Sequence, residues 1–414
     1  MSEPARAPTG YHHGALPETL QQVVLEIIGE AGVGAVTMNE AARRAGVSSG
    51  APYRHFASLD DLLTATAVRT YERFRGRQLA VEAAHVARGA GPKEQLWAAI
   101  DDYFAFARDE PAAFALIFDS HIGQRSRDMD PLALADYEHA AGLLAALTGA
   151  TGHALRTLTL TVSAVVLGHI KLHLDRFSPV SELDEVPRLI RAGVELLLQG
   201  FKASNPDDDG PAAGVTPPPR PAAGSRRAQL LEIAREVVAE HGFERATLRD
   251  VAQRAGVTAP ALYTHFGSRE DLLEQVLEVT ADEIVADIAA TDDPEAGVAE
   301  RLRTRFERWA TVERTRLRVL NQAVAAIDDS PRIATAVEHA QAGWTRFLRD
   351  VLEHGLSTGE VRADLDVDDA IELITACFLG VQVAVTGGLA TRDLGVLLDD
   401  LLELLLARML SSRR

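Results

Sequence analysis

The sequence has very few cysteines and lysines. Its 414 residues include one cysteine, Cys377, and three lysines, Lys93, Lys171 and Lys202. A single cysteine excludes a disulfide framework and is typical of a reducing compartment. The first twenty residues lack the apolar core of a secretory signal, so we expect a cytoplasmic protein. With 47% hydrophobic residues and a mean hydropathy of −0.02, the chain is typical of a soluble protein. Its length predicts at least two domains.

Long uncharged hydrophobic runs are also scarce. One such run, from Leu373 to Ala390, approaches the length that spans a membrane. It contains Thr375, Gln382 and Thr386 and lies within an amphipathic helical region. We therefore expect a buried helix at an interface rather than a membrane span.

Basic charge is in deficit, since the net charge is −18. Such a charge argues at first against a nucleic-acid partner. The acid is unevenly distributed, however. Residues 1–77 carry 8 basic and 8 acidic side chains, and residues 220–275 again carry 8 of each. The excess acid therefore lies outside these two neutral segments.

The two neutral segments contain the same motif. Residues 44–56 read RAGVSSGAPYRHF and residues 254–266 read RAGVTAPALYTHF, and residues 37–63 align with 247–273 without a gap. Thr37 and Thr247 each have the form of a capping box that opens a helix. Gly46 and Gly256 follow, where a chain leaving a helix favours a left-handed residue. A short helix, a turn with glycine and a second short helix form a helix-turn-helix.

Side-chain oxygens are available to cap the second helix of each motif. Thr258 precedes Pro260, which suits the first turn of a helix. In the first copy Pro52 suits a helix capped by Ser49 better than one capped by Ser48. Both copies are preceded by an amphipathic helix that ends at Gly32 or Gly242.

Downstream, Ser58 and Ser268 each precede a fourth helix, in which the letters DLL begin three residues after the serine. This order of four helices, with its Tyr-x-His-Phe ending, resembles the DNA-binding head of the tetracycline-repressor (TetR) family. Two copies in one chain imply a tandem fusion. The resemblance implies an all-α fold with two helix-turn-helix heads, each followed by a helical ligand-binding and dimerisation domain. It also implies that the two halves form a pseudo-two-fold single-chain dimer.

The resemblance implies which residues contact DNA. In a helix-turn-helix the second helix enters the major groove. Arg54 is the candidate for a guanine contact, which the matching Thr264 cannot make in bidentate form. Tyrosine, histidine and threonine side chains are expected to hold phosphates. The family usually has a basic residue at the start of the fourth helix, and Arg269 fits this pattern whereas Leu59 does not. The expected DNA-binding residues are Thr37, Asn39, Ser48, Ser49, Gly50, Ala51, Tyr53, Arg54, His55, Thr247, Arg249, Thr258, Ala259, Pro260, Ala261, Tyr263, Thr264, His265 and Arg269. Phe56 and Phe266 are expected in the core.

The rest of each half is rich in helical patterns without strand alternation. The expected helices lie near 93–109, 112–121, 132–149, 154–176, 183–202, 276–290, 296–312, 314–328, 332–356, 367–389 and 394–410. Residues rich in Pro, Gly and Asp separate the halves and indicate a flexible linker. The expected domains are a head over 11–78, a body over 79–202, the linker over 203–224, a head over 225–275 and a body over 276–414.

Large apolar residues at helical spacing are candidates for effector pockets, with core packing as the alternative. They are Trp97, Phe104, Phe114, Phe118, His169, Trp309, Trp344 and Phe378. His169 and His173 have a spacing that suits a metal on one helical face. No second set of ligands accompanies them, so an interface or pocket role is favoured. His12 and His13 could also be metal ligands, but they belong to an opening, YHHGALPETL, that resembles one subgroup of the family and lies near DNA. No metal site or cofactor is expected.

No catalytic residues are expected, because carboxylates occur in no recognisable catalytic context and Cys377 has an apolar setting. The sequence therefore predicts a DNA-binding transcriptional regulator, a repressor released by a small apolar ligand, reading an asymmetric operator. The alternative is a ligand-sensing or partner-binding protein whose heads have lost DNA binding. A monomeric pseudo-dimer is expected, with domain exchange into a true dimer of four heads as the competing arrangement.

Overall fold

A computed structural model describes residues 16–118, 130–174, 185–198, 225–243, 246–311, 314–323, 327, 330–386 and 394–411. Within these ranges the chain is helical, and β pairing is limited to one isolated bridge between Val361 and Leu410. The all-α class is therefore confirmed. The linker at 203–224 and the pair His12 and His13 lie outside the described residues.

The first half consists of a head and a body joined by one long helix. Its elements are α1 (Leu16–Ala31), η1 (Val33–Ala35), α2 (Met38–Arg44), η2 (Pro52–Arg54), α3 (Leu59–Ala87), α4 (Pro92–Asp109), α5 (Pro111–Ile117), α7 (Asp130–Thr148), α8 (Gly152–Leu174) and α9 (Val186–Leu198).

The second half repeats this order. Its elements are α10 (Arg226–His241), α11 (Leu248–Ala255), α12 (Ala259–Tyr263), α13 (Arg269–Thr291), α14 (Val298–Thr311), α15 (Arg314–Ala323), α16 (Pro331–Thr358), α17 (Val367–Thr386) and α18 (Leu394–Met409). Each predicted body helix has a counterpart, although the one expected at 276–290 is the later part of α13. The ends expected at 121, 176, 202 and 389 lie outside the described residues.

Head and body are continuous in each half. The expected domain boundaries after residues 78 and 275 fall inside α3 and α13. Leu62 and Leu63 at the start of α3 are buried in the head, while Tyr71 and Phe74 are buried further along the same helix. A movement of the body end of α3 is therefore carried directly to the first head.

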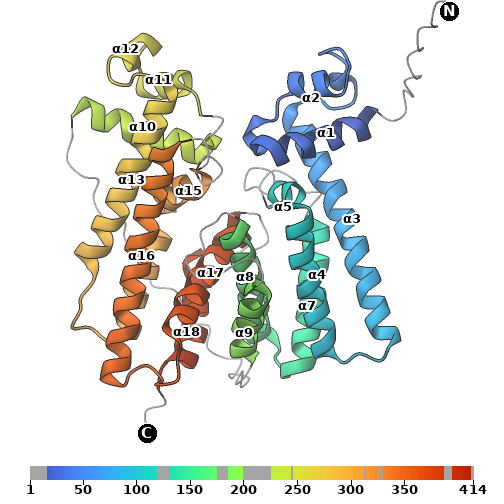
Figure 1. Cartoon of the computed structure of the whole chain (residues 1–414), viewed down its shortest axis with the longest axis vertical. Coiled ribbons are helices and arrows are strands. Elements are labelled where there is room, and N and C mark those ends of the chain that lie inside the picture. The colour runs from blue at the N-terminus through green and yellow to red at the C-terminus, as the bar shows by residue number, and fades with distance from the viewer. Residues whose placement is uncertain are drawn as a thin grey trace, which may run out of the picture.

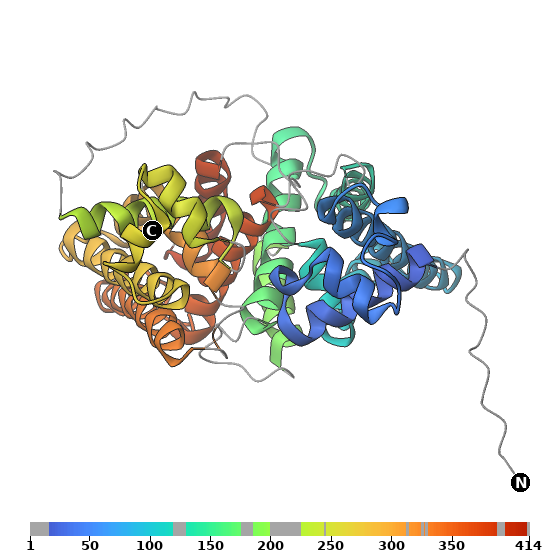
Figure 2. The same ribbon diagram turned by 90° about the horizontal axis from the view of Figure 1, so that it is seen from above.

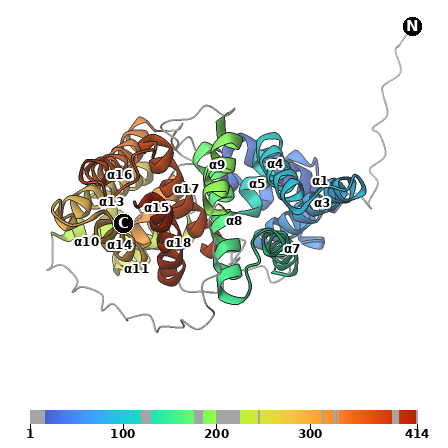
Figure 3. The same cartoon turned by 90° about the horizontal axis from the view of Figure 1, so that it is seen from below.

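The two halves lie side by side and are related by an approximate two-fold axis. In Figure 1 both heads occupy the top of the molecule, with α8, α9, α17 and α18 between the two bodies. Figure 2, seen from above, shows both heads toward the viewer, and Figure 3 shows the four central helices from below. One chain thus supplies both sides of the bundle, as expected for a single-chain pseudo-dimer.

Helices α8 and α17 approach each other at two glycines. A Cβ atom on Gly168 would lie 1.7 Å from the carbonyl oxygen of Ala376, and one on Gly380 would lie 2.0 Å from the carbonyl oxygen of Ala164. The contacts are reciprocal, because each helix carries Ala-x-x-x-Gly, over 164–168 and 376–380. Small residues at this spacing let two helix backbones come close together. The symmetry of the pseudo-dimer is therefore visible in its sequence.

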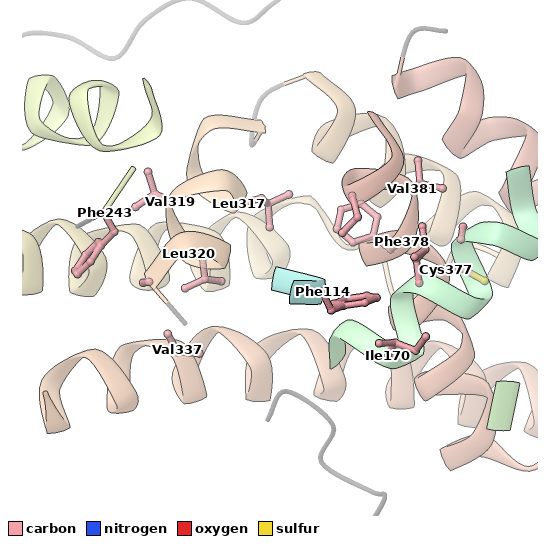
Figure 4. Packing of buried hydrophobic residues seen from close by; sticks show 14 of the residues in the cluster. Phe114, Ile170, Phe243, Leu317, Val319, Leu320, Val337, Cys377, Phe378 and Val381 are labelled. Atoms are coloured by element: carbon pink, nitrogen blue, oxygen red, sulfur yellow. The ribbon is translucent and has the colours of Figure 1, made fainter. Parts of the chain in front are cut away.

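Hydrophobic packing continues across the interface. Phe114 and Ile170 of the first half belong to the same buried cluster as Cys377, Phe378 and Val381 of the second (Figure 4). Among the described residues, α8 is the helix long and apolar enough to cross a membrane, and 72% of its apolar window is buried inside the protein. Helix α17, which covers most of the uncharged run, packs against it, while residues 387–390 lie outside the described residues.

Candidate DNA-binding heads and effector cavity

The first helix-turn-helix is built by a cap and a left-handed glycine. The Thr37 side chain accepts a hydrogen bond of 3.1 Å from the Glu40 N–H and so begins α2. Gly46 has φ of 68°, a conformation that L side chains rarely adopt. The Val47 N–H then donates to the Ala42 carbonyl at 3.0 Å, which closes the end of the helix.

The second helix-turn-helix repeats this construction with a complete capping box. The Thr247 oxygen accepts from the Asp250 N–H at 3.2 Å, and the Asp250 carboxylate accepts from the Thr247 N–H at 3.1 Å. Gly256 has φ of 65°, in the left-handed region. Both turns could be predicted from the sequence, because threonine caps the first helix of each motif and glycine adopts the left-handed conformation at its end.

The second element of the first motif differs from the expected helix. It is a single 3-10 turn, η2, with Ala51 rather than Ser48 or Ser49 at its N-cap position and no side-chain cap. In the second head, Thr258 is the N-cap of α12, but its side chain also makes no cap hydrogen bond. Pro52 at the first position of η2 lacks an N–H, and Gly50 disfavours a longer helix. The predicted serine and threonine caps are wrong here.

Exposure separates the tyrosines from the phenylalanines of the motif. Tyr53 is 56% exposed and Tyr263 is 57% exposed, whereas Phe56 and Phe266 are buried. Exposed large aromatic side chains at matching places need a partner other than the core. The other expected DNA-contacting residues that are exposed are Thr37, Asn39, Ser48, Ser49, Gly50, Arg54, His55, Thr247, Arg249, Thr258, Pro260, Thr264 and His265. Ala51, Ala259, Ala261 and Arg269 are half-buried.

Several arginines of the heads are held by carboxylates. Hydrogen bonds from Arg43 and Arg44 hold the pKa of the Glu40 carboxyl down to about 2. In the second head Arg254 pairs with Glu240. Arg54 and Arg249 differ, because among the described residues neither side chain has a hydrogen bond or ion pair. Within the described residues, Arg54 of the first head and Arg249 of the second are therefore exposed guanidinium groups available to a ligand.

Arg269 is engaged within its own head. Its Nε donates to the Ala246 carbonyl at 2.7 Å and its Nη2 donates to the Phe243 carbonyl at 2.9 Å. The side chain thus ties the start of α13 to the chain between α10 and α11. Leu59, at the matching place in the first head, is half-buried against the core and makes no such polar contact. The two heads differ in construction as well as in their exposed residues.

A cavity lies inside the first body, among α3, α4, α7 and α8. It holds about 160 Å³, and its apolar wall includes Leu96, Ile100, Leu143, Val166 and Leu167. Its polar lining residues are Tyr71, Arg75, Gln78, Glu82, Gln95, Asp102, Tyr103, Asp136, Tyr137, His139 and Ser163. A largely apolar cavity with a few convergent polar groups is the usual form of a small-molecule site.

Asp136 joins two walls of this cavity. Its carboxylate accepts hydrogen bonds from the Tyr71 hydroxyl and from Arg75, both on α3, while Asp136 itself lies on α7. The ion pair with Arg75 is mostly buried, and burial raises the pKa of Tyr71 well above its usual value. Because α3 also carries part of the first head's core, this cluster links the cavity to that head.

Asp102 has an unused acceptor in the cavity wall. Its Oδ1 lies 3.0 Å from Arg77 Nε. Its Oδ2 is buried and has no hydrogen-bond partner in the structure. A buried carboxylate oxygen without a donor is costly, so this atom marks a place where a ligand can add a hydrogen bond.

The second body is closely packed at the place that matches the wall of the first-body cavity. Helices α3 and α13 begin at residues 59 and 269, so Arg75 and Val285 occupy matching positions. Val285 packs on Gly343 of α16, where an added Cβ would lie 2.7 Å from Val285 Cγ2. Between α14, α16 and α17, Trp309 lies 3.3 Å from Phe378 and 4.2 Å from Trp344 between ring centroids. The two bodies therefore differ in how closely their helices pack at these places.

The eight residues expected at effector pockets do not line the first-body cavity, and their role in binding an effector stays a prediction. None of them is among the described residues that line the first-body cavity. Phe104, Phe114, Trp309, Trp344 and Phe378 are buried in the core, and Phe118 stacks near Phe114. Trp97 lies beneath Arg191, with the guanidinium 5.8 Å from the ring centroid.

His169 lies at the interface between the halves. It is buried, and its Nδ1 lies 2.8 Å from the Val165 carbonyl. Burial lowers its pKa from 6.5 to about 4, so the ring is neutral at pH 7. Within the described part of the chain, no group of three His, Cys, Asp or Glu side chains is placed to hold a metal ion. Burial also raises the pKa of the Cys377 thiol, in keeping with its apolar setting.

The polar residues of the cavity were missed by reasoning from the sequence. A signal was present, because Tyr71, Arg75, Gln78 and Glu82 follow one another at steps of three or four along α3. Such spacing places them on one face of the helix. A row of polar residues on one face of a helix is found where that face lines a cavity. It is also found where the face is exposed to solvent, so the pattern alone does not distinguish the two.

Comparison with known protein families finds three matching regions within the chain. The domain described as "Bacterial regulatory proteins, tetR family" matches residues 24–66 and 230–276. The "Tetracyclin repressor-like, C-terminal domain" matches residues 298–386. The first description covers both helix-turn-helix motifs, and the second covers most of the second body.

Curated relatives of the chain are named as transcriptional regulators. The HTH-type transcriptional repressor KstR2 of Mycobacterium tuberculosis is 33% identical over 150 residues, covering 35% of this chain and 73% of the relative. The fatty acid metabolism regulator protein of Bacillus subtilis is 24% identical, covering 43% of this chain and 93% of the relative. The solved structure of KstR2 from M. tuberculosis is 25% identical with a TM-score of 0.36, covering 46% of this chain and 98% of that one.

Proposed function

Because the chain belongs to the tetR family of bacterial regulatory proteins, with the DNA-binding region present twice, we propose that it represses transcription at an asymmetric operator. In this proposal each head occupies one half-site, and a small, mostly apolar effector in the first body releases the DNA. The protein acts in the cytoplasm as a single-chain pseudo-dimer.

The observation that carries this proposal is the pair of unlike exposed surfaces at one end of the molecule (Figure 1). The first surface presents Ser48, Ser49 and Arg54, and the second presents Thr258, Pro260 and Thr264. Base edges in the major groove are read by such side chains, whereas tyrosine, histidine and threonine contacts to phosphates fix position. Unlike surfaces favour unlike half-sites.

The shared bundle supports a single-chain unit. A homodimer needs a second chain to complete the four central helices, but α8, α9, α17 and α18 all come from this chain. Contacts across the halves include the hydrogen bond of 3.1 Å from Thr157 to Asp400. Exchange of halves between two chains would give a dimer with four heads and is the competing arrangement.

The cavity supports release by an effector in the first body. A ligand that enters beside Arg75 and Asp136 changes the hydrogen bonds between α3 and α7. Because α3 runs from this cavity into the first head, its displacement changes how that head meets DNA. The effector shifts the equilibrium between the DNA-binding and released arrangements of α3 only by as much as it binds one of them more tightly.

The test is to capture genomic DNA fragments with the full chain and then measure the affinity of an enriched fragment against salt. Specific binding by several phosphate contacts should weaken by about 10³-fold or more between 50 and 200 mM salt. A scrambled fragment of the same composition is the control and should bind far more weakly.

A second candidate function is favoured by the charge of the heads. Arg43, Arg44 and Arg254 are neutralised by neighbouring carboxylates, which reduces the attraction to DNA. If no fragment is enriched and affinity does not depend on salt, the protein is instead a ligand sensor whose heads do not bind DNA.

A further inference from the structure

We infer that the cavity of the first body binds a small apolar molecule that carries a positively charged amine, and that it rejects molecules with a carboxylate or phosphate. This inference deepens the proposed function, on which it rests, by naming the chemical class of the effector.

The charged groups that line the cavity determine which sign of charge a ligand can carry. Glu82, Asp102 and Asp136 line the cavity, against one guanidinium, that of Arg75. Arg75 is already paired with Asp136, so it is not available to an anionic ligand without breaking that ion pair. Arg77 likewise pairs with Asp102, and its guanidinium also rests over the rings of Phe74 and Phe106. An entering anion would meet three carboxylates, and both arginines beside them are already engaged in ion pairs.

Glu82 adds to the acidic character. The closest cationic group to it is the His139 ring, with Nδ1 3.4 Å from Glu82 Oε1. That contact is an ion pair only when the ring is protonated. Among the described residues no lysine or arginine forms an ion pair with Glu82, so its carboxylate lacks a permanently charged partner beside the cavity.

Asp102 Oδ2 gives the ligand its anchor. This oxygen is buried, has no hydrogen-bond partner and belongs to a residue in the cavity wall. A carboxylate is an acceptor only, so the ligand atom that satisfies it must be a donor. A charged donor makes a hydrogen bond about twice as strong as a neutral one. An ammonium group satisfies the oxygen and balances the surplus negative charge at once.

The rest of the cavity fixes the size and polarity of the framework. The cavity holds about 160 Å³, and Leu96, Ile100, Leu143, Val166 and Leu167 form its apolar wall. An apolar cavity of about 150 Å³ accommodates benzene. A single ring bearing a short amine therefore matches both the volume and the position of the carboxylates.

The experiment uses three probes of nearly equal size: benzylamine, benzyl alcohol and benzoate. Their dissociation constants for the full chain are measured at pH 7 by NMR titration. We expect benzylamine to bind about tenfold or more tightly than benzoate, with benzyl alcohol between them, since charged hydrogen bonds are the stronger. Equal or tighter binding of benzoate, or no binding of any probe at 10 mM, overturns the inference.

A pair of variants locates the amine. Asp102→Asn removes the charge at the anchor and should reduce benzylamine affinity by about tenfold while leaving benzyl alcohol nearly unchanged. Asp101→Asn is the matched control, because Asp101 is the neighbour on α4 and pairs with Arg191 on the outside of the body. A benzylamine preference that survives Asp102→Asn overturns the assignment, and the wild-type series holds even if this variant fails to fold.

The result is separable from the proposed function. Binding of benzylamine without release of DNA would support the inference while contradicting the repressor mechanism. Salt-dependent binding of DNA together with a preference for benzoate would support the proposed function and contradict the inference about the amine.

Discussion

In the proposed repressor, single side chains on the two heads determine how each half-site is read. Arg54 is exposed and has no ion pair among the described residues, whereas Thr264 at the matching place donates its hydroxyl to the Ala261 carbonyl at 2.7 Å. An arginine is suited to a bidentate contact with guanine, and a threonine is not. The two heads therefore carry different information.

Arg54→Ala should relax the base preference at one position of one half-site and cost about 1–3 kcal/mol there. Tyr263→Phe should instead weaken binding about equally for all sequences, because phosphate contacts carry no base information. Affinities for a set of single-base operator variants distinguish the two patterns. Arg73→Ala, which removes an exposed side chain paired with Glu110 in the body, is the control and should change neither. Equal weakening at both half-sites by Arg54→Ala would contradict this role.

His169 makes the interface sensitive to acid. Its folded pKa of about 4 lies below the ordinary value of 6.5, because burial between the halves disfavours the charged ring, and Asp369 offsets this only in part. The unfolded chain therefore binds more protons between these values, and stability is present above pH 6.5 and falls as the pH drops toward 4. A shift of this size corresponds to about 3 kcal/mol.

Urea unfolding at pH 7 and pH 5 measures this effect. The wild type should lose stability on acidification, and His169→Gln should lose less. His85→Gln is the matched control, because His85 also places its Nδ1 2.8 Å from the carbonyl four residues earlier but is half-exposed. An unchanged pH dependence in His169→Gln would show that other groups cause the acid sensitivity.

At the scale of helices, the crossing of α8 and α17 holds the halves together. Gly168→Ala places a Cβ within 1.7 Å of a backbone oxygen of α17, so one of the helices must move. We expect a loss of about 1–3 kcal/mol in stability, as for overpacked cores. Gly142→Ala on α7 is the control, since nothing lies within 4 Å of the added carbon there. That exposed helical glycine should tolerate alanine or gain stability of up to about 1 kcal/mol.

Thermal unfolding of both variants measures the difference. If Gly168→Ala is as stable as Gly142→Ala, the close crossing does not exist in solution.

The helices could be predicted from sequence because their signals are local. Thr37, Thr247, Ser58 and Ser268 each accept the hydrogen bond from the N–H three residues on, as their positions indicated. The short η2 could not be predicted, because Gly50 and Pro52 allow several turn geometries and the packing of the head selects one of them. Side-chain caps were expected there, where none formed.

The cavity could not be predicted because it depends on the distance between helices far apart in sequence. Arg75 and Val285 occupy matching places, yet α3 stands away from α7 whereas Gly343 lets α16 approach α13 closely. No local pattern fixes these distances. The apolar residues chosen as pocket candidates were typical of cores as much as of ligand sites, and several are core residues.

At the scale of the whole molecule, the two bodies are unequal. The first contains the cavity beside Asp102, and the second packs Trp309, Trp344 and Phe378 together in its interior. We therefore expect one effector to bind per chain. Calorimetry with an identified effector should give a stoichiometry near one, and Asp102→Asn should weaken that single binding event by about tenfold. Two equal sites per chain for one compound would contradict the unequal bodies.

The central claim is that one chain reads two different half-sites with two different heads. Selection from random DNA by the wild-type chain tests this claim most directly. We predict enrichment of a site whose halves differ in sequence and lie about one helical turn, roughly 35 Å, apart or a multiple of it. Enrichment of a perfect palindrome would contradict it.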